Sequence, residues 1–365
     1  MATMQDVARR AGVSAKTVSN VLNGYPYIKE STRARVMAAI DELGYQMNIS
    51  ARNLRAGRTG IIALAIPELS LPYFAQLSDA VIEAAATKGW TVVIEPTGGV
   101  RERELEVLSG ARRHLVDGVI FSPLALGPDD ADHLRVDFPL VLLGERIPHG
   151  PVDHVTMNNV EASRAATQHL LDLGRRRIAV IGAFPGEQMG TATVRLNGYL
   201  AALEAAGIER DDTLITSPGP WWHRTEGAQA MQRLLDADIR FDAVFGFNDT
   251  LALGALHVLL WSGRRVPEDV AVVGFDNIEE TRFSMPPLTS VEPGRLQIAR
   301  TAVDLLAERV GGTGPAGQRE IYADFTLEVR ESTVGRQRSP GGAEAVSPPL
   351  EADPTVTPLD AASGR

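Results

Sequence analysis

From residue 60 onward, short apolar segments alternate with amphipathic helical segments, and this alternation restricts the fold more than any other feature of the chain. The first set of strands is predicted at 61–67, 91–95, 118–121 and 140–144, with helices at 73–88, 101–114 and 128–135. The second set has strands at 178–182, 243–247 and 270–275, with helices at 160–173, 193–206, 224–236 and 250–262. Short buried strands separated by helices form parallel sheets that are covered on both faces. We therefore predict an α/β body of two similar lobes, each built on a doubly wound parallel sheet.

The carboxyl ends of the strands are where an open parallel sheet binds ligands. Aromatic and polar side chains fall there or in flanking segments: Tyr73, Phe74, Ser122, Glu145, Arg195, Trp222, Asn248 and Asp276. This combination suits a polyhydroxylated ring that stacks on an aromatic face and is hydrogen-bonded at its rim. Each residue also has a structural alternative. The amide and the carboxylates can cap helices, the arginine can lie on a helix surface, and the aromatic rings can belong to the core.

Composition narrows the class of protein. A length of 365 residues suggests two or three domains. The absence of cysteine excludes disulfides and thiolate metal sites. No apolar segment approaches the roughly 20 residues of a membrane-spanning helix, and the N-terminal residues lack the apolar region of an export signal. We expect a cytoplasmic protein that makes no membrane contact.

Charge is distributed unevenly along the chain. The whole chain carries a net charge of −10 at pH 7. Residues 1–60 contain nine Lys or Arg against four Asp or Glu, which amounts to +5, so the remainder carries −15. A basic head on an acidic body directs the head toward polyanions such as nucleic acids.

The basic head begins with two short helices joined by a tight turn. Thr3 can cap the first helix, Gly12 permits a left-handed turn, and Ser14 can cap the second helix. The outward face of the second helix then carries Ala15, Lys16, Thr17 and Asn20. A short, polar and basic face of this kind suits the major groove of DNA, and a solvated helical hairpin is the alternative. A third helix over 29–43, stopped by Gly44, completes a three-helix head.

Residues 46–60 join the head to the body and have too few apolar positions to form a stable helix alone. Within this segment, Leu54 lies between Arg52 and Arg55. An apolar side chain flanked by basic groups is typical of a minor-groove wedge, in which the apolar group parts a base step. The alternative is an ordinary linker that happens to contain a leucine.

The head and hinge resemble those of the lactose-repressor (LacI/GalR) family. The match runs through Val7-Ala8-x-x-Ala11-Gly12-Val13-Ser14-x-x-Thr17-Val18-Ser19-x-Val21-Leu22-Asn23, then Thr32-Arg33 and Ala51-Arg52-x-Leu54. The resemblance implies that the second helix reads an operator half-site, with Lys16 suited to a guanine and Asn20 to an adenine. It also implies a hinge that becomes helical on DNA as two subunits meet. The implied DNA-binding residues are Thr3, Ser14, Ala15, Lys16, Thr17, Asn20, Asn23, Arg52, Leu54 and Arg55.

The resemblance continues through about residue 333 and implies a periplasmic-binding-protein-like body. It places Arg195, Asn248 and Asp276 in a cleft between the lobes, with the five other candidates beside them. Two positions depart from the family pattern. The chain has Leu-Pro-Tyr-Phe at 71–74 where many relatives have Asn-Pro-Phe-Phe, and it has Gly144 where many have an acid. Glu145 can replace the absent acid or point to solvent, so the ligand can differ from the commonest sugars.

No pattern of catalytic residues accompanies this organisation. The chain lacks a Gly-x-Gly-x-x-Gly after the first strand, a phosphate-binding loop and a Gly-x-Ser-x-Gly elbow, and its seven histidines show no metal-ligand spacing. We expect no enzymatic activity, no cofactor and no metal site. The alternative class is the solute-binding protein of a sugar transporter, which would lack the basic head and carry an export signal.

We therefore predict a DNA-binding transcriptional repressor. It is expected to bind a near-palindromic operator as a homodimer and to respond to a small ligand in the cleft, with a sugar as the expected ligand. The expected parts are a head (1–45), a hinge (46–59), a first lobe (60–159 and 291–318), a second lobe (160–290 and 319–333) and a tail (334–365). The tail is rich in Pro, Ala, Gly and acids and lacks heptads, so we expect it to be disordered.

Overall fold

A computed structural model describes residues 2–22, 25–45, 58–110, 115–184, 189–219 and 221–336 of the chain. The chain forms two compact units, Met1–Gly60 and Ile61–Arg365. Most of the predicted hinge, residues 46–57, and most of the predicted tail, residues 337–365, lie outside the described residues.

The first unit contains a three-helix head, as predicted. Its helices are α1 (Met4–Ala11), α2 (Ala15–Leu22) and α3 (Glu30–Leu43). They enclose a small core of Val7, Ala8, Ala11, Val18, Val21, Val36 and Ala39. These positions recur every three or four residues along each helix, so each helix buries one face. Gly12 (φ 64°) and Gly44 (φ 55°) end α1 and α3 in the left-handed conformation, which glycine adopts without steric cost.

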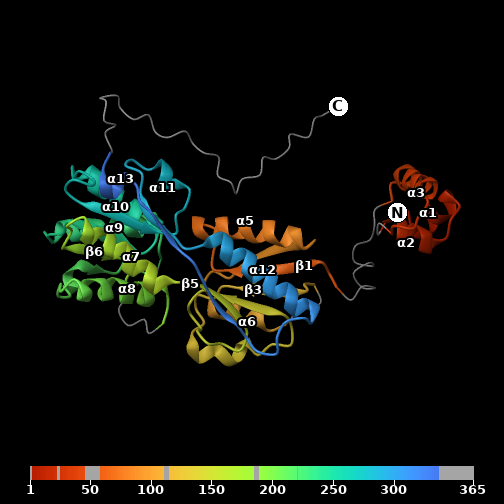
Figure 1. The fold of residues 1–365 in the computed structure, drawn as a ribbon, viewed down its shortest axis with the longest axis horizontal. Helices are drawn as coiled ribbons and strands as arrows, with labels where there is room; N and C mark the ends of the chain where they lie inside the picture. The colour runs from red at the N-terminus through yellow and green to blue at the C-terminus, as the bar shows by residue number, and fades with distance from the viewer. Residues whose placement is uncertain are drawn as a thin grey trace. The chain divides into compact units, whose positions relative to one another are not determined.

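The second unit contains two six-stranded sheets, one in each lobe (Figure 1). The first sheet has the order β11-β5-β4-β3-β1-β2, and all of its pairs are parallel. Its strands are β1 (Ile61–Ile66), β2 (Thr91–Pro96), β3 (Gly118–Phe121), β4 (Leu140–Leu143), β5 (Asp153–Met157) and β11 (Glu320–Ala323). Helices α5 (Pro72–Thr87), α6 (Arg101–Leu108), the 3-10 helix η1 (Pro128–Leu134) and α12 (Arg295–Gly311) belong to the same lobe.

The second sheet repeats this plan with the order β12-β10-β9-β8-β6-β7. Its pairs are parallel except for β10 with β12. The strands are β6 (Ile178–Ile181), β7 (Ile215–Thr216), β8 (Ala243–Gly246), β9 (Ala271–Phe275), β10 (Thr289–Glu292) and β12 (Thr326–Glu328). The helices are α7 (Asn159–Asp172), α8 (Thr191–Ala205), η2 (Asp212–Leu214), α9 (Arg224–Asp236), α10 (Asp249–Trp261), α11 (Glu280–Phe283) and α13 (Glu331–Val334). The predicted pair of α/β lobes is confirmed.

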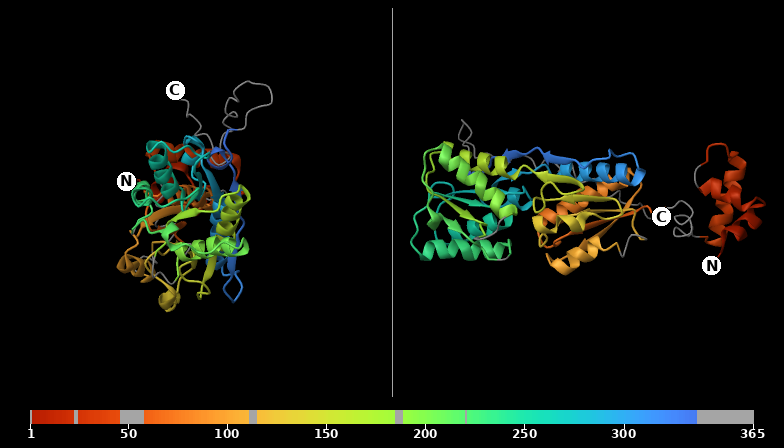
Figure 2. Two further views of the ribbon diagram at one scale, coloured as in Figure 1. Left: turned by 90° about the vertical axis from the view of Figure 1, so that its left-hand side faces the viewer. Right: turned by 90° about the horizontal axis from the view of Figure 1, so that it is seen from below.

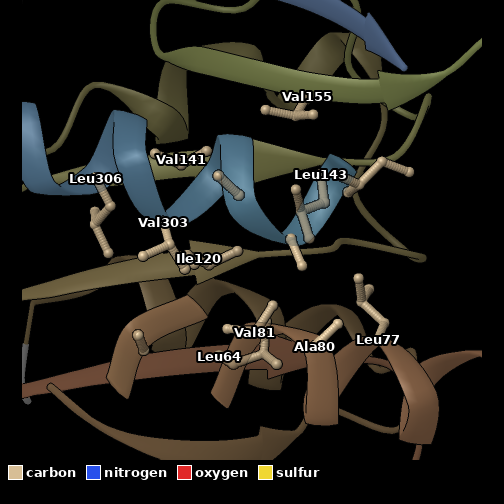
Figure 3. Close-up of a cluster of buried hydrophobic side chains, with 14 of the residues drawn as sticks. Leu64, Leu77, Ala80, Val81, Ile120, Val141, Leu143, Val155, Val303 and Leu306 are labelled. Carbon is tan, nitrogen blue, oxygen red and sulfur yellow. The ribbon is translucent and has the colours of Figure 1, made fainter. Parts of the chain in front are cut away.

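Both faces of the first sheet are buried. On one face, α5 and α12 lie side by side over the sheet, and residues such as Val81 of α5 and Val303 of α12 pack against Ile120 of β3 (Figure 3). On the other face, Ala63 and Val119 belong to a second cluster that includes residues of α6 and η1. Burial on both faces explains why these strands are apolar throughout instead of alternating with polar residues.

The chain passes between the lobes three times, after β5, after β10 and between β11 and β12. Figure 2 shows the C-terminal part of the body, in blue, running along both lobes. Because β11 pairs with β5, residues 320–323 belong to the first sheet, whereas the expected second lobe included 319–333. Multiple crossings allow the lobes to hinge or twist but not to separate.

The remaining differences from the predicted elements are local. The strand β5 was not predicted, because its polar residues Asp153, His154 and Thr156 break the apolar pattern. The helix predicted at 101–114 ends at Leu108, and residues 111–114 lie outside the described residues. The segment predicted as a helix at 128–135 is the 3-10 helix η1.

Candidate functional site

A side-chain cap begins each of the first two helices. The backbone N–H of Asp6 donates to Thr3 Oγ1 at 3.3 Å, and the Asp6 carboxylate accepts from the backbone N–H of Thr3 at 3.0 Å. The hydroxyl of Ser14 accepts from the backbone N–H of Thr17 at 3.1 Å and so begins α2. Both caps satisfy amides that a helix start leaves unpaired. Thr3 therefore begins α1, and Ser14 begins α2.

The face of α2 is exposed at some of the predicted DNA-binding positions and not at others. Ser14 and Lys16 are exposed, and Thr17 and Asn20 are half-buried. Ala15 is also half-buried and packs against the core of the head, which differs from the expected outward position. The other predicted DNA-binding residues lie outside the described residues: Asn23, Arg52, Leu54 and Arg55.

In the body, all eight predicted ligand-binding residues line one cavity of about 170 Å³. The residues are Tyr73, Phe74, Ser122, Glu145, Arg195, Trp222, Asn248 and Asp276. The cavity lies at the carboxyl ends of strands from both sheets: Ser122 follows β3, Glu145 follows β4, and Asp276 follows β9. This is where parallel sheets place their ligand sites.

Arg195 is the most highly constrained of these residues. Its guanidinium is buried, donates from Nε to Asn159 Oδ1 at 2.8 Å, and donates from Nη1 to the carbonyl oxygen of Phe247. Its Nη2 lies 3.6 Å from Asp276 Oδ1, and its Cζ lies 3.5 Å from the centroid of the Phe275 ring. Ion pairing, hydrogen bonding and ring contact together hold one conformation of a charge that is costly to bury.

Asp276 provides a carboxylate that the protein itself leaves available. Its backbone is in a strained conformation with φ 111°, and its side chain is buried. Among the described residues, none donates a hydrogen bond to its carboxylate, which forms an ion pair with Arg195. Burial raises the pKa of Asp276 to about 7, against the opposing effect of the nearby Arg195 and Arg295 cations. The carboxylate can accept hydrogen bonds from a molecule in the cavity.

Two other predicted residues are engaged within the protein. Asn248 caps α10, because its Oδ1 accepts from the backbone N–H of Leu251 at 2.8 Å, and its Nδ2 donates to the Trp222 carbonyl oxygen at 3.0 Å. Glu145 reaches across the cavity to the second lobe, where its carboxylate accepts from Thr191 Oγ1 and from Asn159 Nδ2 (3.2 Å). Both residues line the cavity, yet their polar atoms already have protein partners.

Aromatic rings form much of the remaining wall. Tyr73 and Phe74 meet edge to face with centroids 5.3 Å apart, and the rings of Trp222 and Phe184 lie parallel at 6.2 Å. The cavity also includes residues that the sequence reasoning missed, namely Glu68, Thr156, Phe184, Thr191 and Trp221. Phe184 could have been found because it follows β6 as Ser122 follows β3. Thr156 gave no signal, because the strand that carries it was not predicted.

Neither a metal site nor a membrane-crossing segment is present in the described part of the chain. Its His, Asp and Glu residues form no group of three or more that could hold a metal ion. None of its helices is long and apolar enough to cross a membrane.

Comparison with known proteins places both units in one class. Residues 3–48 match the family described as "Bacterial regulatory proteins, lacI family", and residues 167–333 match the "Periplasmic binding protein-like domain". A lacI-type helix-turn-helix head followed by a two-lobed periplasmic-binding-protein-like body is the domain organisation of one class of bacterial transcriptional regulator.

Whole-length relatives narrow this class to a family. The chain is 39% identical to the HTH-type transcriptional regulator CelR of Thermobifida fusca over 342 residues, which is 90% of this chain and 98% of that protein. The solved complex of the transcriptional regulator CelR with cellobiose is 34% identical, with a TM-score of 0.67, and covers 91% of this chain and 100% of that chain. The lac repressor dimer bound to operator and the anti-inducer ONPF is 28% identical, with a TM-score of 0.78, and covers 91% and 99%. The chain belongs to the lacI family of bacterial transcriptional regulators.

Proposed function

We propose that the protein is a repressor that binds a near-palindromic operator as a homodimer and whose operator affinity is set by a sugar in the interlobe cavity. The arrangement of the cavity supports the sugar most directly. Aromatic faces from both lobes surround the carboxylate of Asp276, which is buried and accepts no hydrogen bond from the described residues. Sugars present apolar ring faces for stacking and hydroxyl groups for a carboxylate. The CelR complex with cellobiose is a relative that holds such a ligand.

The head supports operator binding. Ser14 caps α2, Ser14 and Lys16 are exposed, and the first 60 residues carry a charge of +5. A single small head makes few base contacts, so two heads on two half-sites give the specificity that one lacks. The lac repressor was solved as a dimer on its operator.

Ligand and operator are coupled through the angle between the lobes. The ligand contacts both lobes, and three chain crossings restrict the lobes to hinge or twist motions. A ligand that prefers one angle shifts the population of operator-competent dimers, with a coupling of about 1–3 kcal/mol or roughly 5–150-fold in affinity.

A selection experiment tests this function. The full-length protein is incubated with a random double-stranded DNA library, and bound sequences are enriched and read. Enriched sequences with two inverted half-sites are expected, and a single unrepeated motif contradicts the homodimer. The selected site is then titrated in the presence of cellobiose, glucose and adenosine. A roughly 5–150-fold change in operator affinity with a sugar is expected, and no change with either sugar rejects the proposed ligand.

A further inference from the structure

We propose that the hydroxyl of Thr156 and the indole N–H of Trp222 are ligand contacts that specify a neutral, hydroxyl-rich molecule; this inference rests on the proposed function of the cavity. Thr156 Oγ1 and Trp222 Nε1 are both buried polar atoms without a hydrogen-bond partner among the described residues. Both residues line the cavity. Buried polar atoms are nearly always paired, so two unpaired atoms at one cavity indicate that the partner is the ligand.

Thr156 lies where the cavity wall lacks a side chain. It is 4% exposed and follows Val155, which pairs with Leu143, so Thr156 lies beside Gly144 across β4 and β5. The family resemblance leads us to expect an acid at Gly144, and glycine leaves this part of the wall open. Ser122 and Thr156 both line the cavity, and Ser122 Oγ lies 3.8 Å from the position that a Cβ at Gly144 would occupy.

Glu145 does not take the place of the absent acid. Its carboxylate already accepts hydrogen bonds from Asn159 and Thr191 of the second lobe. A ligand therefore meets hydroxyl groups on this wall, which can donate as well as accept.

Both the backbone and the ring of Trp222 are held by contacts with neighbouring residues. Its carbonyl oxygen accepts from Asn248 Nδ2 at 3.0 Å and from Thr250 Oγ1, which anchors the backbone. Its ring lies parallel to Phe184 and contacts Phe247, which restricts the side chain. The indole nitrogen is a donor only, so it requires an acceptor on the ligand.

The Trp222 indole N–H, the Asp276 carboxylate and the Thr156 hydroxyl together restrict the chemistry of the ligand. Trp222 requires an acceptor, Asp276 requires donors, and Thr156 takes either. Hydroxyl groups meet all three requirements at once. A carboxylate or phosphate ligand would face the acidic residues Glu68, Glu145 and Asp276, which outnumber the two arginines of the cavity, Arg146 and Arg195.

The test uses Thr156→Val and Trp222→Phe in the full-length protein, with Thr167→Val as the matched control. Thr167 is also a fully buried threonine, but its hydroxyl donates to the Ser163 carbonyl oxygen at 2.8 Å. Without ligand, we expect Thr156→Val to leave the melting temperature unchanged or higher and Thr167→Val to lower it. With cellobiose or glucose, measured by calorimetry, Thr156→Val and Trp222→Phe should each weaken binding about tenfold, and Thr167→Val should not.

Each outcome decides the inference. A fall in melting temperature for Thr156→Val equal to that of Thr167→Val would show that the hydroxyl has a protein partner, and would overturn it. Wild-type affinity in both cavity variants would also overturn it while leaving the sugar assignment intact. If the wild-type protein binds neither sugar, the proposed ligand class fails, and the inference fails with it.

Discussion

At the scale of single residues, Asp276 combines features that stability alone does not favour. Its backbone is strained, its carboxylate is buried, and Asp249 lies nearby as a second buried acid whose pKa is raised by burial and by Asp276. Burying an acid that the protein does not hydrogen-bond lowers the stability of the folded state. Such sites are retained where a ligand uses the group.

The raised pKa of Asp276 gives a prediction about pH. Below about pH 4, Asp276 is protonated in both the folded and unfolded states. Between about pH 4 and pH 7 only the folded state keeps the proton, so the contribution of Asp276 to stability falls as pH rises and is lost above about pH 7. Asp276→Asn should therefore gain in melting temperature relative to the wild type as pH rises from 4 to 7.

The comparison is made by thermal unfolding across this pH range, with the exposed Asp236→Asn as the control. The control should follow the wild-type curve. Parallel curves for Asp276→Asn and the wild type would contradict the raised pKa.

At the scale of elements, the loop after β3 is held by one buried carboxylate. Glu104 of α6 is fully buried and accepts from the backbone N–H groups of three consecutive loop residues, Leu124 (2.7 Å), Ala125 (3.1 Å) and Leu126 (2.8 Å). Loops are usually more mobile than the strands and helices that they connect. The carboxylate instead fixes a segment whose first three residues, 122–124, line the cavity.

Glu104→Gln should therefore affect both stability and ligand binding. Glutamine keeps one acceptor oxygen, but its NH2 group replaces the other oxygen and cannot accept from the backbone N–H that faces it. We therefore expect a loss of about 2 kcal/mol in the free energy of unfolding. Sugar affinity should fall as well, because the loop carries Ser122. Urea unfolding and calorimetry measure the two effects, and Glu106→Gln on the exposed face of α6 is the control. Loss of stability without loss of ligand affinity would contradict a role for this loop in ligand binding.

At the scale of the whole molecule, the two units carry net charges of opposite sign. The head and its linker carry +5 and the remaining residues carry −15. A negative charge on the body opposes approach to a polyanion such as DNA, so in the proposed function the basic unit is expected to make the phosphate contacts. We therefore expect the proposed operator affinity to depend on counterion release by the first unit.

Operator binding should accordingly weaken steeply with salt. The logarithm of the association constant should fall linearly with the logarithm of salt concentration, by about 0.9 per phosphate contact. Fluorescence anisotropy with the selected operator measures the slope, and Lys16→Gln should reduce it by about one contact if Lys16 binds phosphate and change the base preference if it binds a guanine. A slope near zero would contradict the role of the basic head.

Local features were accessible from the sequence because the interactions that form them span three or four residues. Thr3 and Ser14 cap helices through bonds to amides three residues away, and Gly12 turns where a left-handed residue is needed. The alternation of strands and helices likewise predicted two parallel sheets. Parallel sheets bind ligands at the carboxyl ends of their strands, and the eight residues predicted at or near those ends line one cavity.

The tertiary structure alone decided how polar residues far apart in the sequence are paired. Asp153 begins β5 because its carboxylate binds Arg309 and Arg319, 156 and 166 residues later, and β11 joins the first sheet beside it. Burial raises the pKa of Asp153, but these hydrogen bonds outweigh it and lower the pKa to about 2. The same long-range packing gives Glu145 its partners in the second lobe, and among the described residues it leaves Thr156 Oγ1 and Trp222 Nε1 without a hydrogen-bond partner. Sequence by itself determined the apolar strands, most of the helices and the edge of the sheets where the candidate site lies, because short-range periodicity and caps specify them. The partners of each polar atom depend on which distant segments meet, and only the folded chain decides that.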